Sequence, residues 1–217
     1  MKYITKLDAP NFYLEHTEGM TNWDEYHDLD KGKSKQKLRD HIIKKEQSNR
    51  CIYCECSVTV NTSHVEHVVP RSKDDNGVFD YSNLAVSCEG KTHNPPSDPK
   101  FYNCGHEKSS VYDASLFLSP LSEKDISEYF KFDLDTYKLI CSGKDATRFT
   151  HTIDSTLKLN STYLLKGREL RLRSFKKGLK KIKDLTQRKQ KAHDFISKEE
   201  GAFISFLTYF VLHGEAR

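Results

Sequence analysis

Four of the six cysteines are spaced in a way that suits a bound zinc ion; they are Cys51, Cys54, Cys88 and Cys104. The first two form a C-x-x-C motif, which places two thiolates on one side of a tight turn. Tetrahedral zinc needs two further soft ligands, and the later pair can supply them, with Cys56 or His93 as a substitute for one. A redox C-x-x-C would need a βαβ context, which the pattern lacks. We therefore predict a structural Zn²⁺ whose binding energy also helps this region to fold.

An acidic residue and a histidine stand side by side between these cysteines, in the segment His-Val-Glu-His-Val-Val-Pro-Arg-Ser at 64–72. Hydrolysis of a phosphodiester needs a nucleophilic water, a base to deprotonate it and a cation to stabilise the transition state. His67 suits the base because its pKa lies near neutrality, and the Glu66 carboxylate suits a hard divalent ion such as Mg²⁺. His64 is more often a surface residue of a strand than a second ligand. Together with Asn83, which alone would be an ordinary loop residue, the set indicates catalysis.

In their order these residues resemble the motif of HNH endonucleases, which have a ββα-metal fold. The likeness rests on a C-x-x-C, an acidic residue followed by histidine, an asparagine before an apolar strand, and a cysteine with a trailing lysine. A closer similarity is to the PtuB-type HNH subunits of the Septu anti-phage system and their retron-associated relatives. It is carried by segments that cover most of the chain: Lys6, Ala9-Pro10, Trp23, 51–55, 66–72, 83–88, Cys104-Gly105, 119–121 and 152–168.

The resemblance implies a role for each residue of the core motif. His67 would be the general base, Asn83 would orient its imidazole through a hydrogen bond, and Glu66 would ligate a catalytic Mg²⁺ or Mn²⁺. His106 is the candidate for the last HNH position and for a second ligand of that ion. Many relatives carry this last residue directly after the cysteine, where Gly105 stands here. The alternatives for the last position are Asn103 and His93.

The same resemblance implies the partners. The chain would be the effector subunit of a prokaryotic anti-phage system that works with a PtuA-like ATPase, and its substrate would be nucleic acid, DNA first and RNA as the alternative. A second interpretation is a zinc-stabilised nucleic-acid-binding or adaptor subunit without catalysis. The Glu66-His67 pair favours the enzyme, because a binding module does not require it.

A concentrated basic stretch runs from 166 to 191, where twelve lysines and arginines face only two acids. Candidate contacts to a phosphate backbone are Arg173, Lys177, Lys180 and Lys181, with Arg71 and Lys108 near the core motif. Such contacts are independent of sequence and sensitive to salt. The alternative is a solvated face of a helix whose other side packs in the core. The aromatic C-terminal segment, 203–210, could dock on the ATPase, but burial in the chain's own core is the expected role.

Periodicity predicts the elements that must position these residues. We expect a helix at 35–47, short strands at 58–60, 65–69 and 84–87, a helix at 122–130, a hairpin at 129–141 and helices from there to the end. The predicted fold class is therefore α+β. A zinc-braced ββα-metal core would occupy 51–110, between an N-terminal helical flank at 1–50 and a C-terminal hairpin and helical region with a basic face at 111–217.

Composition agrees with this organisation. The composition, with 36% hydrophobic and 30% charged residues, predicts a modest core and highly charged helical surfaces. A net charge of +4 is weak evidence for nucleic acid by itself. Residues 1–20 do not resemble a signal peptide, and the longest apolar stretch, 202–212, is too short for a bilayer. We therefore expect a cytoplasmic protein without a membrane partner, in which cysteines are metal ligands or free thiols.

Overall fold

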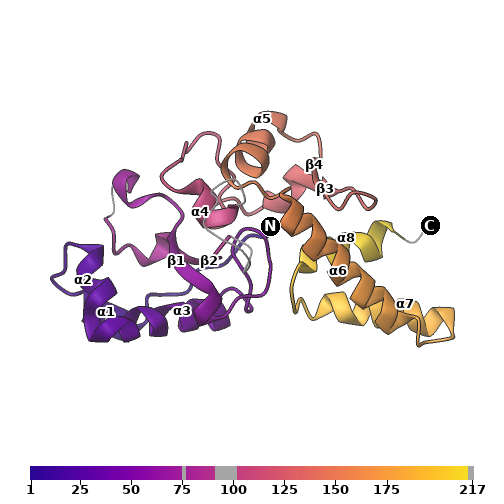
Figure 1. The fold of residues 1–217 in the computed structure, drawn as a ribbon, viewed down its shortest axis with the longest axis horizontal. Helices are drawn as coiled ribbons and strands as arrows, with labels where there is room; N and C mark the ends of the chain where they lie inside the picture. Colours follow the sequence, from indigo (N-terminus) through magenta and orange to yellow (C-terminus); the bar gives the residue numbers. More distant parts are fainter. Residues whose placement is uncertain (75–76, 91–101, 215–217) are drawn as a thin grey trace.

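The structure is a computed structural model of the 217-residue chain that describes residues 1–74, 77–90 and 102–214. Its strands are β1 (Ser63–His67), β2 (Leu84–Cys88), β3 (Phe130–Phe132) and β4 (Leu139–Cys141). Its α-helices are α1 (Asn11–Thr17), α2 (Trp23–Asp28), α3 (Lys33–Lys45), α4 (Cys104–Lys108), α5 (Ala146–Phe149), α6 (Thr162–Leu179), α7 (Leu185–Ser197) and α8 (Ile204–His213). The hairpin of β1 and β2 lies near α1–α3, and α6–α8 lie together at the other end of the molecule (Figure 1).

The central hairpin pairs β1 and β2 antiparallel, with Glu66 opposite Ala85 and His67 opposite Leu84. Every residue of β2 is buried, in agreement with the predicted strand at 84–87. The far edge of β2 is closed by Gln47, which follows α3: its side-chain amide donates to the Val86 carbonyl and accepts from the Val86 N–H, both at 2.8 Å. This pairing covers the backbone of β2 at Val86 and fixes α3 against the sheet.

Two predicted strand boundaries are wrong for local reasons. The expected strand at 58–60 is interrupted because Thr59 and Thr62 form a reciprocal capping box that starts a 3₁₀ turn. The strand expected at 65–69 begins and ends two residues earlier, as β1. It ends there because the side-chain amide of Asn83 accepts a hydrogen bond from the Val69 N–H at 2.7 Å and donates one to the Val69 carbonyl at 2.8 Å.

The C-terminal region contains the predicted hairpin, as β3 and β4, but only a 3₁₀ turn at Ile126–Tyr129 where a helix at 122–130 was expected. The basic stretch is two helices, because Asp184 interrupts it and caps α7 by accepting from the Gln187 N–H at 2.8 Å. A π-helical segment, Thr150–Thr156, leads to Leu157, whose carbonyl accepts from the Cys104 N–H at 2.9 Å. The C-terminal region thereby holds the start of α4.

The end of the chain packs against the C-x-x-C loop. The Glu55 carbonyl accepts a hydrogen bond from the Phe203 N–H at 2.8 Å. The Glu55 carboxylate accepts hydrogen bonds from the N–H and the hydroxyl of Ser205, at 2.9 and 2.5 Å. Burial by itself would raise the pKa of Glu55, but the N-terminal amino group and Ser205 outweigh it and lower that pKa to about 2. Phe206 is buried with its ring 5.2 Å from that of Phe132, so part of the aromatic C-terminal segment belongs to the chain's own core.

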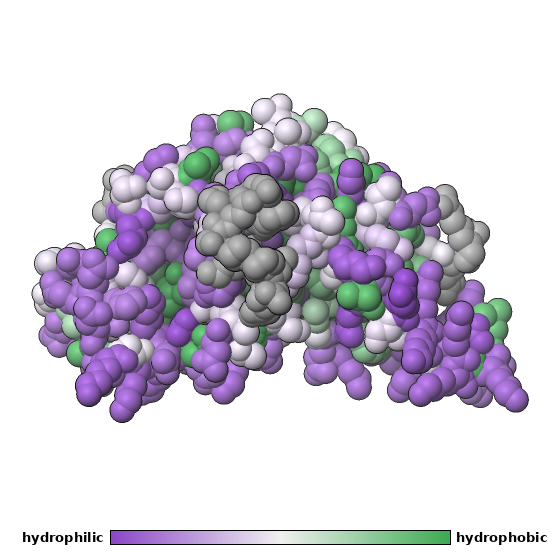
Figure 2. Space-filling model, in the orientation of Figure 1, coloured by the Kyte–Doolittle hydropathy of each residue, from purple (hydrophilic) through white to green (hydrophobic). Residues whose placement is uncertain are grey.

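The face of the molecule shown in Figure 2 is largely hydrophilic. On the face shown in Figure 2, hydrophilic residues cover both ends of the molecule and hydrophobic residues form small separate patches. None of the described helices combines the length and the apolar character that a membrane crossing requires.

Candidate functional site

The four predicted zinc-ligand cysteines come together in the core. Their sulfur atoms all lie within 4.8 Å of one another, and all four side chains are buried. The Sγ atoms of Cys54 and Cys88 are 3.8 Å apart. Zinc bound tetrahedrally by sulfur at about 2.3 Å requires a sulfur–sulfur separation of about 3.8 Å, so donor type and spacing both fit zinc. Contact with Cys104 lowers the pKa of the Cys54 thiol to about 6, which favours the thiolate that binds metal.

Local backbone bonds explain how residues so far apart in sequence meet. The Ile52 N–H donates to the Val86 carbonyl at 3.0 Å, which sets the C-x-x-C turn beside β2, whose last residue is Cys88. The fourth cysteine enters from α4, where the Gly105 N–H donates to the Ser87 hydroxyl at 3.1 Å. Cys56 is half-buried and outside the group of four, and the other substitute, His93, lies outside the described residues.

Beside the cysteine cluster, a polar cleft of about 530 Å³ contains the predicted catalytic pair. Glu66 and His67 both line it, although neighbouring residues of a strand point to opposite faces. His67 is the last residue of β1, where the regular alternation stops before Pro70. The cleft is completed by Arg71, by the 108–110 segment and by the backbone of Gly105.

Glu66 is buried and held by three partners. Tyr53 donates its hydroxyl to Oε1 at 2.9 Å, the Lys108 ammonium lies 3.0 Å from Oε1, and His64 Nε2 lies 3.4 Å from Oε2. Burial would raise the pKa of Glu66, but His64 and Lys108 outweigh it and lower that pKa. Glu66 is therefore a carboxylate, which is the form that binds a divalent cation.

Lys108 differs from its predicted role. We expected a phosphate contact, but the side chain is 1% exposed and is occupied by Glu66 and by the His67 carbonyl, to which it donates at 3.2 Å. A charge with this burial neutralises a neighbouring carboxylate more readily than it reaches a phosphate in solvent. The structure corrects the assignment: Lys108 is a partner of Glu66.

His67 is held in one orientation by two contacts. Its Nε2 lies 2.9 Å from the Val78 carbonyl, and its ring lies 4.5 Å from that of Trp23 in an edge-on arrangement. A carbonyl only accepts, so Nε2 carries the hydrogen and Nδ1 keeps the lone pair. Burial lowers the pKa of His67, which keeps the imidazole neutral at pH 7. Such a ring can act as a general base.

Asn83 does not bond to that imidazole as predicted. Its amide is taken by the two backbone groups of Val69 and by the Asp74 carboxylate, to which it donates at 2.6 Å. The reason is that the Val69 N–H and carbonyl lie beyond the strand ladder and need partners. The partner of the His67 ring is instead Val78, so Asn83 holds the loop that follows His67 and acts on the ring only indirectly.

A second group of metal-ligating side chains lies next to Glu66. The donor atoms of His64, Glu89 and His106 all lie within 4.8 Å of one another. His106 Nε2 is 3.0 Å from Glu89, and the rings of His64 and His106 are 4.5 Å apart. Burial would lower the pKa of His64, but Glu66 and Glu89 outweigh it and raise that pKa to about 9. The predicted pairing of Glu66 with His106 is therefore corrected: His64 lies beside Glu66, and His106 contacts Glu89.

We interpreted His64 as a surface residue of a strand and did not consider Glu89, yet both side chains belong to this group of metal-ligating residues. A signal for His64 was present, because it precedes Glu66 by two positions and so shares its face of β1. Glu89 follows β2 directly and had no recognisable signal. Of the alternatives for the last HNH position, Asn103 is fully buried without a hydrogen-bond partner for its amide among the described residues, and His93 lies outside them.

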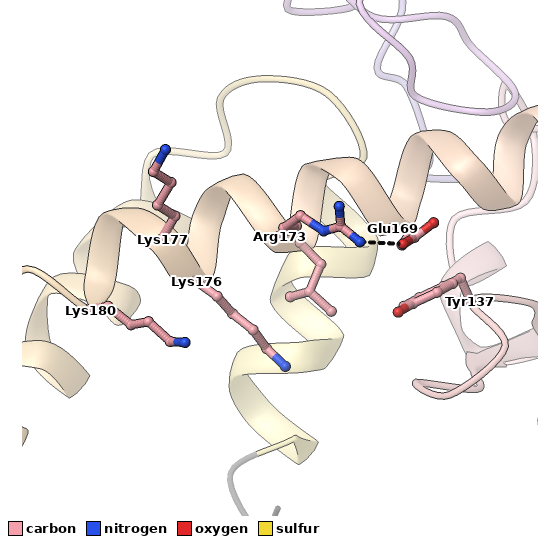
Figure 3. A pocket seen from close by; sticks show the side chains of 7 residues that line it. Tyr137, Glu169, Arg173, Lys176, Lys177 and Lys180 are labelled. Atoms are coloured by element: carbon pink, nitrogen blue, oxygen red, sulfur yellow. Dashed lines mark hydrogen bonds and ion pairs between the residues drawn. The ribbon is translucent and has the colours of Figure 1, made fainter.

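The predicted nucleic-acid contacts lie in two places. Arg71 is about half exposed at the cleft, 3.7 Å from Asp24. The other predicted contacts, Arg173, Lys177, Lys180 and Lys181, are exposed on α6 and just beyond it. Some of them line a pocket of about 430 Å³ with Tyr137 and Glu169, in which Glu169 pairs with Arg173 at 2.9 Å (Figure 3). Lys176, Lys177 and Lys180 all line the pocket, and in the view of Figure 3 the side chain of Lys177 points away from the other two.

Part of the basic stretch is structural. Arg168 is 2% exposed and donates to the Leu159 and Tyr137 carbonyls at 2.9 and 3.1 Å. Arg171 donates to the Ala202 carbonyl at 3.2 Å. The stretch therefore combines residues that hold α6 in place with a solvated basic face, which is separated from the β1–β2 hairpin (Figure 1).

Two comparisons with known proteins bear on the activity of the chain. Residues 51–90 match the HNH endonuclease family model, a segment that contains three of the four clustered cysteines and the Glu66-His67 pair. The chain is also 32% identical, over 114 residues, to a Vibrio cholerae serotype O1 biovar El Tor protein named "Retron Vc95 putative HNH endonuclease". That match covers 51% of this chain and 50% of the relative, so the chain spans about half the length of the relative it matches. Both comparisons support a nuclease.

Proposed function

We propose that this chain is a metal-dependent nuclease of the HNH type that hydrolyses phosphodiester bonds in nucleic acid. The observation that carries the proposal is the cleft in which a buried carboxylate, Glu66, adjoins a neutral histidine, His67, with a defined tautomer. The order β1, β2 and α4, with Glu66 on β1 directly against Gly105 of α4, supports the ββα-metal fold.

The donors of the cleft suit a hard divalent cation such as Mg²⁺ or Mn²⁺, because Glu66 presents a carboxylate oxygen, Oε2, that neither Tyr53 nor Lys108 occupies. When bound there, such an ion offsets the charge that develops on the phosphate. The zinc at the four cysteines would be structural, because its four ligand positions are filled by sulfur.

The protein's own residues would then perform the proton chemistry. The Val78 carbonyl and the Trp23 ring hold the His67 imidazole, so that Nδ1 can take a proton from a water aligned with the phosphorus. His64 and Lys108 keep Glu66 ionised, and Tyr53 donates a hydrogen bond to its Oε1. Asn83 keeps the loop after His67 in place, and Arg71 lies where a phosphate could approach.

We also propose a role in prokaryotic anti-phage defence with an ATPase partner. The relative's name contains the word retron, and the sequence resembles PtuB-type subunits, which supports this role. The basic face on α6 would add salt-sensitive contacts to a phosphate backbone.

The experiment is cleavage of supercoiled plasmid or total RNA in Mg²⁺ or Mn²⁺, with and without the ATPase partner. His67→Ala should slow cleavage by about 100-fold or more, the usual contribution of a general base. His193→Ala, an exposed histidine on α7, is the matched control and should cleave like the wild type. Equal cleavage by His67→Ala and the wild type would remove His67 as the base. Metal-dependent binding without cleavage under any condition would favour the non-catalytic adaptor.

A further inference from the structure

We propose that His64 supplies the nitrogen ligand of the divalent cation held by Glu66, in the space that a side chain at position 105 would occupy, with Glu89 as its positioning residue. The inference deepens the proposed function and rests on it for the purpose of the cation. The ligand set itself is argued from the contacts of the described residues.

The first support is the spacing of the two donor atoms. His64 and Glu66 alternate on one face of β1, and Nε2 lies 3.4 Å from Oε2. A cation with ligands at about 2.1 Å holds neighbouring donor atoms about 3.0 to 3.5 Å apart, depending on its geometry. A single ion can therefore contact both atoms with little movement of either side chain.

The second support is the glycine at position 105. A Cβ atom there would lie 2.4 Å from Glu66 Oε2 and 2.7 Å from His64 Nε2, both closer than van der Waals contact permits. The backbone of α4 thus lies directly against the two donor atoms. With His64 and Glu66 as they lie here, a side chain at position 105 would require one of these two side chains to move, so glycine suits this arrangement.

The third support is the other ring nitrogen of His64. Its Nδ1 faces Glu89 Oε1 at 3.8 Å, and the second oxygen of Glu89 lies 3.0 Å from His106 Nε2. Metal-bound histidines commonly donate their remaining N–H to a carboxylate, which fixes the tautomer and the ring. At 3.8 Å the two atoms form no hydrogen bond in this structure, and Glu89 would accept one from His64 once the ring turns to bind the cation. His106 contacts the far side of Glu89, so it acts through Glu89 and not as a ligand.

The proposal is tested by Mn²⁺ affinity, measured from the electron paramagnetic resonance signal of free Mn²⁺ over the zinc-loaded, full-length protein. Glu66→Gln should abolish binding and so identify the site. His64→Ala, with His64→Gln as a milder second variant, should raise Kd by about 100-fold or more, and Glu89→Gln by about 10- to 100-fold. His106→Ala should raise Kd less than Glu89→Gln does, because His106 acts only through Glu89, and the distant His193→Ala should match the wild type.

Three results would overturn the proposal. One is wild-type affinity in His64→Ala. Another is a loss in His106→Ala as large as in His64→Ala, which would place the ion between His64, Glu89 and His106. The last is Mn²⁺ binding that survives Glu66→Gln. Zinc content and thermal melting verify that each variant is folded. If Mn²⁺ binding depends on His64 but cleavage does not depend on His67, this inference stands and the proposed nuclease fails. If cleavage depends on His67 but Mn²⁺ binding does not depend on His64, the proposed nuclease stands and this inference fails.

Discussion

Lys108→Met is the substitution whose effect follows most directly from the geometry. It removes the ammonium that lies 3.0 Å from Glu66 Oε1 in a pair whose side chains are 1% and 7% exposed. Loss of one partner from a buried ion pair typically costs about 3–5 kcal/mol, because the remaining charge stays buried without compensation. Glu66 keeps Tyr53 and His64 as partners, so we expect the lower end, about 3 kcal/mol.

In a chain of this length that cost lowers Tm by about 6–12 °C, at about 2–4 °C for each kcal/mol. The matched control is Lys44→Met, which removes an equally short pair with Asp40 at 2.8 Å on the exposed surface of α3. Exposed pairs at this spacing contribute about 0.3–0.5 kcal/mol, so the control should lose no more than about 2 °C.

The assay is thermal melting of both variants at equal zinc content, in buffer passed over a chelating resin and then with added Mn²⁺. Added Mn²⁺ should recover part of the loss in Lys108→Met, because a cation at Glu66 replaces the missing charge. Equal losses in the two variants, or no recovery with Mn²⁺, would refute the view that Lys108 compensates a buried carboxylate.

Three further predictions concern the metals, the base and the basic face. Metal analysis should find about one tightly held zinc per chain, and Cys104→Ser should lose it together with cooperative unfolding; a folded, active preparation without zinc would contradict this. Burial lowers the pKa of His67, so cleavage should persist below pH 6.5 and fall only as pH drops through that lowered pKa; a fall centred above pH 6.5 would contradict the neutral base. If Lys177 and Lys180 contact phosphate, Lys177→Glu and Lys180→Glu should each weaken nucleic-acid binding. Each should also reduce the slope of log K against log salt concentration by about 0.9, as measured by fluorescence anisotropy across a salt series. An unchanged slope would indicate a solvated face only.

The sequence predicted the elements and residues that depend on local pattern. The strand at 84–87 is a continuous apolar run and was found, as was the hairpin at 129–141. The four cysteines were identified because zinc geometry restricts ligand type and spacing, and the structure brings those four together.

The sequence predictions were wrong where side chains compete with backbone pairing, or where the decisive contacts join residues far apart in the sequence. The Thr59–Thr62 capping box and the bonds of Asn83 to Val69 determine where β1 begins and ends, and neither is visible in hydrophobic periodicity. The burial of Lys108 against Glu66 depends on contacts across 42 positions. Glu89 could be placed only once β2 and α4 were positioned relative to each other.

Element-specific anomalous diffraction from crystals soaked in Mn²⁺ tests the central claim most directly. We predict a zinc peak among the four cysteine sulfurs and a separate manganese peak at about 2.2 Å from Glu66 Oε2, within the cleft that His67 lines. A cysteine cluster without zinc, or manganese that binds only away from Glu66, would contradict a catalytic centre built on these two adjoining metal sites.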